Sequence, residues 1–280
     1  MHQWGVRKHS EARHAQPMRL TFLGTGTSMG VPVIGCPCAV CQSPEPHNKR
    51  LRTSALLEVA GRAILFDAGP DLRQQSLAVG LKRVDGILLT HAHADHIAGL
   101  DDVRPLNFAQ QAAIPLYGSA ATLAMVRERY GYAFVNTSEG SSRPMLDLVE
   151  IQSGVAFDLC GVTVLPFDVQ HGGWTITGFR IGALGYVTDA SSLPAASMAQ
   201  LQGLDVLVLN ALRLTAHPTH FSVDEACDIV ARLQPRRAFL VHMTHDIEHS
   251  SVNARLPERV RLAYDGQVVD VNDRAYEPAS

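Results

Sequence analysis

Residues 90–96 read Thr90-His91-Ala92-His93-Ala94-Asp95-His96, which places four potential metal ligands within six positions. The stretch follows Gly86–Thr90, a short and almost wholly apolar run that is typical of a strand buried on both faces. Side chains alternate along an extended chain, so His91 and His93 point the same way. Where the chain turns into a helix, Asp95 and His96 are offset toward a second point. Imidazole and carboxylate groups bind divalent transition metals, so this pattern predicts a metal site rather than a solvated loop.

Three further ligand-type side chains stand at the ends of other expected strands. His171 follows the run Val162–Phe167, Asp189 follows Leu184–Thr188, and His242 follows Ala238–Val241. Taken singly, each is more often a capping or otherwise satisfied polar residue. Three strands that all end in such residues share one edge of a sheet, however, and together with the first stretch they supply five histidines and two aspartates. That set is large enough for two metal ions.

Strands and helices alternate along most of the chain. Apolar runs and turn signals predict strands at residues 19–23, 54–59, 63–67, 86–90, 162–167, 179–181, 184–188, 206–209 and 238–241. Helices are predicted at residues 72–79, 120–130, 193–201 and 223–233, and Ser222 with Glu225 forms a capping box at the start of the last one. One α/β domain over residues 18–280, with sheets buried under helices, is the simplest organisation. Residues 1–17 are expected to form a disordered N-terminal extension.

Composition and charge exclude several classes of protein. The 280 residues are 46% hydrophobic and 18% charged, and a net charge of −3 gives no overall basic field to attract nucleic acid or an anionic membrane. Apolar runs such as Val206–Leu209 are far shorter than the roughly 20 residues that span a bilayer. Residues 1–17 lack the apolar core of a secretory signal. Five cysteines, three of them within six positions, are no disulfide framework, and they indicate a reducing compartment, the cytoplasm.

The ordered set of histidines and aspartates resembles the metallo-β-lactamase superfamily over about residues 18–271. The resemblance implies an α/β fold, the four-layer αβ/βα sandwich, with a dinuclear metal site between two sheets. It implies that one ion is held by His91, His93 and His171, and the other by Asp95, His96 and His242, with Asp189 bridging both. Asp67, in the run Leu65-Phe66-Asp67-Ala68-Gly69, matches a carboxylate that orients the ligands without binding metal. Two ions that share a hydroxide of lowered pKa imply a hydrolase.

The run Thr219-His220-Phe221-Ser222 narrows the branch of the superfamily. Seen alone, His220 is as readily part of a helix cap as a functional group. Its setting resembles the ribonuclease Z-like phosphodiesterases, in which a histidine here is the general acid that protonates the leaving alkoxide. The resemblance therefore implies His220 and Asp95 as catalytic residues. Superfamily hydrolases of β-lactams and thioesters do not share this element.

Residues 35–41 read Gly35-Cys36-Pro37-Cys38-Ala39-Val40-Cys41 and bring three thiols into one short turn. Three thiolates with a fourth ligand make a tetrahedral structural zinc site, and three reduced core cysteines are the alternative. His245, three residues after His242, is the candidate fourth ligand, because two histidines at that spacing can face opposite ways. A Cys36, Cys38, Cys41 and His245 site beside a dinuclear site resembles the PhnP-type phosphodiesterases of the carbon–phosphorus lyase pathway.

That resemblance implies a small phosphodiester substrate, such as phosphoribosyl 1,2-cyclic phosphate, and no nucleic acid or membrane partner. It also implies two divalent ions at the active site, Mn or Zn, together with one structural Zn and a homodimer. Ribonuclease Z itself carries a long tRNA-gripping arm between the positions that match His171 and Asp189, and 18 residues leave no room for one here. Two alternatives stay open: a carboxylic ester, lactone or thioester hydrolase with the same ions, and a non-catalytic zinc protein. The second alternative needs neither seven ligands nor a proton donor.

Overall fold

The computed structural model describes residues 18–135 and 142–272, so the predicted extension of residues 1–17 lies outside the described residues. The strands form two seven-stranded sheets. The first has the order β14-β1-β2-β3-β4-β5-β6 and consists of β1 (Met18–Gly24), β2 (Ser54–Val59), β3 (Arg62–Phe66), β4 (Gly86–Leu88), β5 (Ile114–Gly118), β6 (Leu146–Glu150) and β14 (Val268–Val271). The second has the order β13-β12-β11-β10-β9-β8-β7 and consists of β7 (Phe157–Leu159), β8 (Val162–His171), β9 (Trp174–Ile181), β10 (Leu184–Tyr186), β11 (Val206–Asn210), β12 (Arg237–Val241) and β13 (Val260–Leu262).

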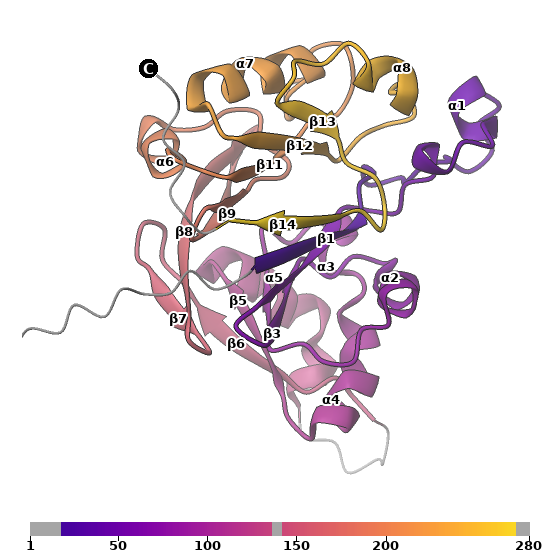
Figure 1. The fold of residues 1–280 in the computed structure, drawn as a ribbon. Helices are drawn as coiled ribbons and strands as arrows, with labels where there is room; N and C mark the ends of the chain where they lie inside the picture. Colours follow the sequence, from indigo (N-terminus) through magenta and orange to yellow (C-terminus); the bar gives the residue numbers. More distant parts are fainter. Residues whose placement is uncertain (1–17, 136–141, 273–280) are drawn as a thin grey trace, which may run out of the picture.

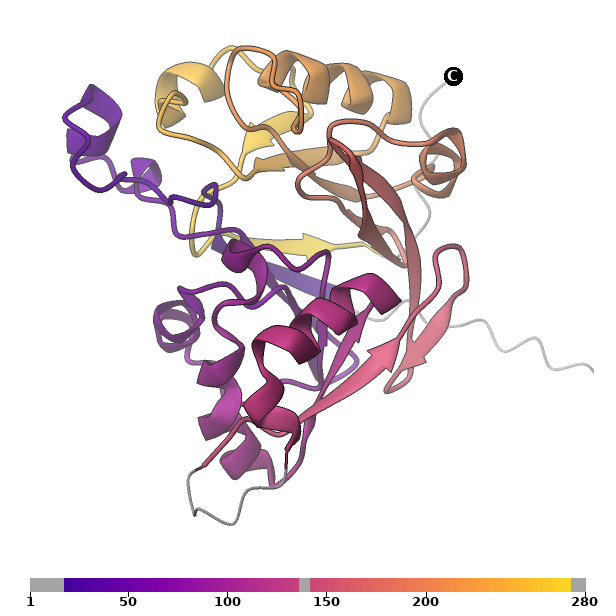
Figure 2. The same ribbon diagram turned by 180° about the vertical axis from the view of Figure 1, so that it is seen from behind.

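The two sheets share one apolar core, to which each contributes its inner face. Phe66 of β3 stacks on Tyr186 of β10 with ring centroids 4.1 Å apart, and Phe22 of β1 meets Phe239 of β12 at 5.6 Å. Buried aromatic rings contribute large apolar areas, so these contacts across the core hold the sheets together. Helices lie on the outside (Figures 1 and 2). The four-layer αβ/βα sandwich predicted from the sequence is therefore confirmed.

Each sheet has its own helical layer. The first sheet packs against α2 (Leu72–Val79), α3 (Ala94–Ile97), α4 (Arg104–Gln110) and α5 (Ala120–Arg129), and the second against α6 (Ala195–Gln200), α7 (Val223–Leu233) and α8 (His249–Asn253). The short helix α1 (Ala39–Gln42) lies on an arm that projects from the body (Figure 1). Within the described residues, none of the helices is long and apolar enough to cross a membrane.

Several predicted elements match the structure residue for residue. They are the strand at 54–59 and the helices at 72–79 and 223–233. The capping box is confirmed as well, since Ser222 Oγ accepts from the N–H of Glu225 and Glu225 Oε2 accepts from the N–H of Ser222 (3.3 and 2.8 Å). The helix expected to begin near Asp95 is α3, and the structure adds elements that the sequence patterns do not predict, namely β5, β6, β7, β13, β14, α1, α4 and α8.

Some strands end earlier than predicted, and the cause lies in the candidate site. The strand predicted to reach Thr90 ends at Leu88, because the N–H of Thr90 donates to Asp67 Oδ1 (2.8 Å). The strand predicted to include Asp67 ends at Phe66, because Asp67 has φ of 60° and turns the chain out of the sheet. These departures bring the polar residues to the ends of the strands.

The direction of the strands gathers those ends at one place. Strands β3 and β4 run parallel in the first sheet, as do β10, β11 and β12 in the second. Strand β8 has the same direction as β10, because both are antiparallel to β9. Carboxyl ends of parallel strands meet at one edge of a sheet, and ligands commonly bind there. The carboxyl ends of strands from both sheets therefore lie at one site.

Candidate active site

Asp67 and the seven predicted ligands of the dinuclear site lie at or just after the ends of strands. Asp67 follows β3, residues 91–96 follow β4, His171 ends β8, Asp189 follows β10, and His242 follows β12. Asp67, Asp189 and His242 have φ values of 60°, 58° and 59°. This left-handed conformation is uncommon for residues other than glycine, and it clusters at functional sites where the surrounding structure enforces it. The backbone turns sharply at these residues as it leaves each sheet.

The first cluster consists of His91, His93 and His171, whose ligand atoms all lie within 4.8 Å of one another. His91 Nε2 and His93 Nδ1 are 2.9 Å apart. His171 Nδ1 is 2.8 Å from the carbonyl oxygen of Thr219, so its N–H donates there and Nε2 is left with a lone pair. Burial and the neighbouring histidines hold the pKa of His91 well below its usual range. The neutral imidazole is the form that binds a metal.

The second cluster consists of Asp95, His96, Asp189 and His242, again within 4.8 Å. His96 Nε2 lies 3.2 Å from Asp95 and 3.4 Å from Asp189, and His242 Nε2 lies 3.4 and 3.2 Å from the same carboxylates. Asp189 also lies within 4.8 Å of His171, a member of the first cluster. The structure thus places Asp189 between the two clusters, where the resemblance puts the bridging ligand.

Asp67 lies beneath the second cluster and is fully buried. Its carboxylate accepts from the N–H and the hydroxyl of Thr90 (2.8 and 2.9 Å) and lies 2.7 Å from His96 Nδ1. The His96 Nδ1–H therefore donates to Asp67, which fixes the ring orientation and directs Nε2 toward Asp95 and Asp189. The contact is the one that an orienting carboxylate would make, and this role of Asp67 stays a prediction.

The charges of the site fit divalent cations. Asp67, Asp95 and Asp189 bring three carboxylates into a buried space, and His96 Nε2 points at two of them without a hydrogen-bond partner. Although burial opposes a charged imidazole, Asp189, Asp67 and Asp95 raise the pKa of His96 well above its usual range. Buried negative charge of this kind needs cationic partners, and imidazole and carboxylate oxygen form the donor set of Zn and Mn sites. The residues present therefore fit the implied ions.

His220 lies at the edge of both clusters. Its Nε2 is 3.1 Å from Asp189 Oδ2, and its ring stacks on His242 with centroids 5.0 Å apart. Thr219 Oγ1 lies 2.8 Å from the other ring nitrogen and positions the imidazole. The ligand atoms of His220, His171 and Asp189 also fall within 4.8 Å of one another. This geometry suits either a proton donor or a ligand, so the catalytic role of His220 stays a prediction.

The cysteine cluster on the arm meets the body at His245. The sulfur atoms of Cys36, Cys38 and Cys41 lie 3.2, 3.4 and 3.4 Å from His245 Nδ1. The N–H of Cys41 donates to Cys38 Sγ (3.4 Å) and lowers the pKa of Cys38 to about 6, whereas burial raises the pKa of Cys41 to about 11. Three sulfurs around one imidazole form the donor set of a tetrahedral zinc site. The four predicted residues are brought together, and their role as zinc ligands stays a prediction.

A buried arginine ties the arm to the loop that carries His242 and His245. Arg50 is 1% exposed and donates to the carbonyl oxygens of Thr244 (3.1 Å) and Ile247 (2.8 Å). Burial lowers the pKa of Arg50 to about 10, which leaves it charged at neutral pH. The two carbonyl groups solvate this charge, so the conformation of the loop depends on Arg50.

The family model described as the Beta-lactamase superfamily domain matches residues 62–243. This range contains Asp67 and every residue of the two histidine and aspartate clusters. The chain belongs to the beta-lactamase superfamily. It is a metal-dependent hydrolase of that superfamily, and the cysteine cluster with His245 lies outside the matched range.

Individual relatives agree with this placement. The ribonuclease Z of Mycobacterium bovis is 31% identical over 214 residues, which cover 70% of this chain and 71% of that protein. A crystal structure described as a new diphosphatase from the PhnP family is 41% identical with a TM-score of 0.86, over 92% of this chain and 98% of that one. The octanoyltransferase of Porphyromonas gingivalis is 36% identical over 264 residues, but the chain spans only 52% of its length.

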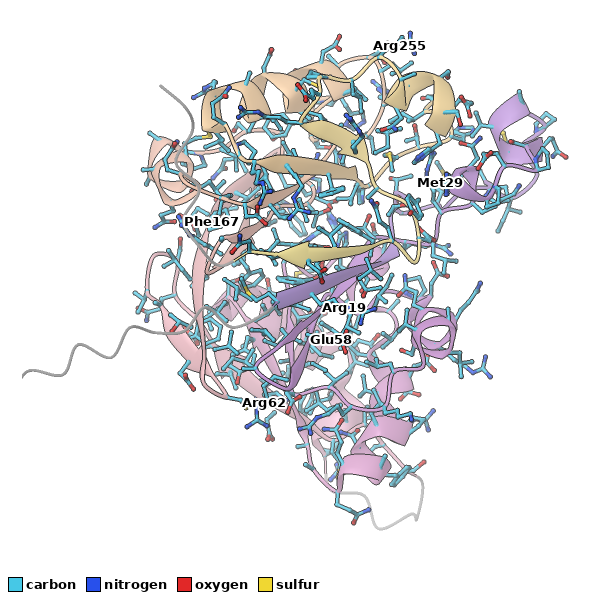
Figure 3. The ribbon with its side chains drawn as sticks, viewed as in Figure 1. Arg19, Met29, Glu58, Arg62, Phe167 and Arg255 are labelled. Carbon is cyan, nitrogen blue, oxygen red and sulfur yellow. The ribbon has the colours of Figure 1, made fainter. Side chains whose placement is uncertain are left out.

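A pocket of 760 Å³ opens over the superfamily site. Besides the clustered residues it is lined by Met29, which Figure 3 labels near the base of the arm, and by Arg213 and His217. Arg213 donates to the carbonyl oxygens of Thr215 and Ala216, and within the described chain no carboxylate lies within 4 Å of its guanidinium. The sequence patterns do not point to Arg213 or His217, and burial together with the charge of Arg213 lowers the pKa of His217, so Arg213 supplies the positive charge here. The spacing of His217 three residues before His220 was the available signal.

The interval between His171 and Asp189 contains β9 and β10, which pair within the second sheet. The expectation that this interval has no room for a long arm therefore holds.

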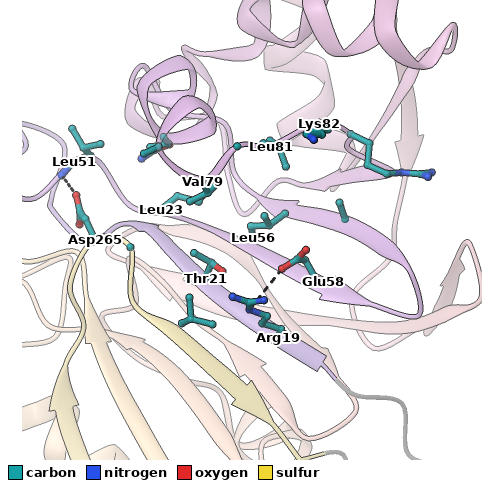
Figure 4. Close-up of a pocket in the computed structure, with 17 residues that line it drawn as sticks. Arg19, Thr21, Leu23, Leu51, Leu56, Glu58, Val79, Leu81, Lys82 and Asp265 are labelled. Atoms are coloured by element: carbon teal, nitrogen blue, oxygen red, sulfur yellow. Dashed lines mark hydrogen bonds and ion pairs between the residues drawn. The ribbon is translucent and has the colours of Figure 1, made fainter.

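A second cavity, of 620 Å³, lies between α2 and the strands β1 and β2 (Figure 4). Its lining is largely apolar, and Arg19 and Glu58 form an ion pair of 3.9 Å within it. It contains none of the predicted site residues, so the chemistry belongs to the pocket over the clusters.

Proposed function

We propose that this hydrolase cleaves a small or cyclic phosphodiester, for which phosphoribosyl 1,2-cyclic phosphate is the named candidate. The observation that carries the proposal is the position of His220, 3.1 Å from Asp189 at the edge of two metal-ligand clusters. A general acid beside such clusters serves a poor alkoxide leaving group, which is what most phosphodiesters release. Two related proteins named for phosphate chemistry, a diphosphatase and a ribonuclease Z, support the same class of reaction.

The pocket supports a small anionic substrate. A volume of 760 Å³ lies within the range of small-molecule sites, roughly 300–1,000 Å³. Arg213 faces this pocket with its charge unpaired by any carboxylate of the described chain, and His217 lies beside it. An anionic phosphodiester would satisfy this positive charge on binding.

Each residue of the two clusters would have a role in metal binding or in proton transfer. His91, His93 and His171 would hold one divalent ion, Asp95, His96 and His242 the other, and Asp189 would contact both. Such ions, Mn or Zn, supply an activated water at neutral pH and offset charge at phosphorus when they are bound. His220 would donate a proton from Nε2 to the leaving oxygen. Asp95, which lines the pocket, would accept the proton of the attacking water.

A panel of three substrates tests the proposal. Purified protein, chelated and then reloaded with Mn or Zn, is assayed with bis-p-nitrophenyl phosphate, a lactone and a thioester. We expect the diester to be hydrolysed at least about tenfold more efficiently than the others, a difference of about 1.4 kcal/mol in barrier. The activity should be lost on chelation and return with metal. A clear preference for the lactone or the thioester would replace this proposal with carboxylic ester chemistry.

A further inference from the structure

One exposed aromatic side chain adjoins the active-site pocket and has no part in the mechanism above. Trp174 is the first residue of β9 and follows the turn Gly172-Gly173 after the predicted ligand His171. Its ring centroid lies 4.8 Å from that of His93, at an interplanar angle of 35°. His93 lines the 760 Å³ pocket, so Trp174 packs against a residue of the pocket wall.

The exposure of Trp174 is not explained by folding. Its side chain is 46% exposed, although burying a ring of this size contributes a large apolar area to stability. Covering one face of His93 would require only an aliphatic side chain. A Cβ placed on Gly173 would meet no atom within 4 Å, which shows that the space at the tip of the turn is open.

A second exposed apolar side chain belongs to the same pocket. Met29 lines the same pocket and is 54% exposed. Exposed apolar side chains gathered around a polar pocket mark ligand-binding surfaces more often than isolated ones do. Indole rings stack on planar heterocycles without regard to their identity, and the methionine thioether adapts to irregular shapes.

We infer that Trp174 is a stacking platform for a planar ring carried by the substrate, a nucleobase or an aryl group, while the scissile phosphate lies over the metal-ligand clusters. This inference rests on the proposed phosphodiesterase function and adds a specificity residue to it. A nucleobase and an aryl group both present a flat π-face to the indole ring. Substrates that carry one or the other distinguish between them.

The test uses three diesters with the same p-nitrophenolate leaving group and the same single negative charge. They carry thymidine through its 5′ oxygen, a phenyl group or a methyl group as the second ester. Base–aromatic stacking is worth about 1–3 kcal/mol, so Trp174→Leu should lower kcat/KM for the thymidine ester by about 5- to 150-fold. The methyl ester should change by less than about twofold, because it has no ring to stack. If kcat/KM for the phenyl ester falls as well, Trp174 stacks on any planar ring and not on nucleobases alone.

Two matched variants complete the kinetic test. Trp174→Phe keeps an aromatic face and should retain most of the preference for the thymidine ester. Phe108→Leu removes an aromatic side chain of similar exposure, 56%, from α4 and should leave all three esters unchanged. Equal losses on the thymidine and methyl esters, with reduced metal content, would overturn the inference and make Trp174 a residue that positions His93.

Fluorescence gives a readout that does not require catalysis. The chain has two tryptophans, Trp4 and Trp174, so a Trp4→Phe variant reports on Trp174 alone. Thymidine 5′-monophosphate should quench this emission in a saturable way, and methyl phosphate should not. Absence of quenching would overturn the inference even if the diesters are hydrolysed. Quenching without hydrolysis of any diester would retain the platform and reject the phosphodiesterase function.

Discussion

The histidine and aspartate clusters and the cysteine cluster are assembled in opposite ways. The first set comes from the ends of strands in both sheets, and most of its members are buried and held by further contacts, such as those of Asp67 with Thr90 and His96. The second set sits on an arm that projects from the body, and its sulfurs meet the body at one histidine, His245. Cys36 and Cys38 are only half-buried.

This difference in assembly indicates that the histidine and aspartate clusters depend on the fold, whereas the cysteine cluster stabilises it. Hydrogen bonds and strand ends position the histidine and aspartate clusters before any ion binds, so removing ions there should cost activity and leave the fold in place. The cysteine cluster has few contacts apart from its own, so a metal bound there would hold the arm against the body. Changes in the two sites should therefore separate activity from stability.

Asp189 gives the largest expected effect. Because it lies between the clusters, Asp189→Asn and Asp189→Ala should abolish turnover, with kcat falling by well over tenfold, about 1.4 kcal/mol of barrier. Asn tolerates the left-handed backbone that Asp189 adopts, so the Asn variant should also keep the wild-type Tm. Asp168→Ala, an exposed carboxylate on β8, is the matched control for kinetics and melting. A kcat within tenfold of wild type would exclude Asp189 as the bridging ligand.

Substitution of His220 should give the second-largest loss of activity, and it tests the role of a residue at the edge of the same site. His220→Ala should lose roughly 10²–10⁴-fold on a diester with a poor leaving group and much less on a p-nitrophenyl ester, which needs little protonation. Metal content, measured by elemental analysis, should not change. Loss of metal would make His220 a ligand, as its contact with Asp189 also permits. Equal losses on both esters with full metal occupancy would indicate phosphate binding instead.

The cysteine cluster should show the smallest effect on catalysis. A Cys36→Ala/Cys38→Ala variant should lose one tightly bound zinc per chain, because three thiolates outbind imidazole and carboxylate ligands. Its Tm should fall while kcat stays within about tenfold at a temperature where it is folded. Cys160→Ala, an exposed cysteine outside the cluster, should change neither quantity. Unchanged zinc content in the double variant would remove the cluster as a metal site.

Much of the site was predictable because its signals are local. Four ligand-type residues fall within six positions after a buried strand, and His171, Asp189 and His242 each end an apolar run. The direction of the parallel strands then brings these residues together. His245 was predictable from its spacing to His242 alone.

The strands that were not predicted have weak or misleading patterns of apolar and polar residues. Pro115 lies within β5, and proline usually argues against a strand in the interior of a sheet. In β6, Val149 breaks the alternation of apolar and acidic residues, and β13 is three residues long, so neither strand gives a strong periodic signal. Arg213 and Trp174 belong to no sequence motif, and only the pocket relates Arg213 to the clusters, as the ring contact with His93 does Trp174.

The contact between the arm and His245 has a consequence for the unfolded chain. Cys36 and His245 are 209 positions apart, so a zinc ion held by both would close a loop over most of the polypeptide. Such a closure restricts the denatured ensemble, and for a loop of this length the entropic gain is on the order of 5 kcal/mol. The zinc would thus act as a removable cross-link. Oxidation of the thiolates would open this ring into a linear chain and shift the folding equilibrium, although none of the three cysteines belongs to the histidine and aspartate clusters.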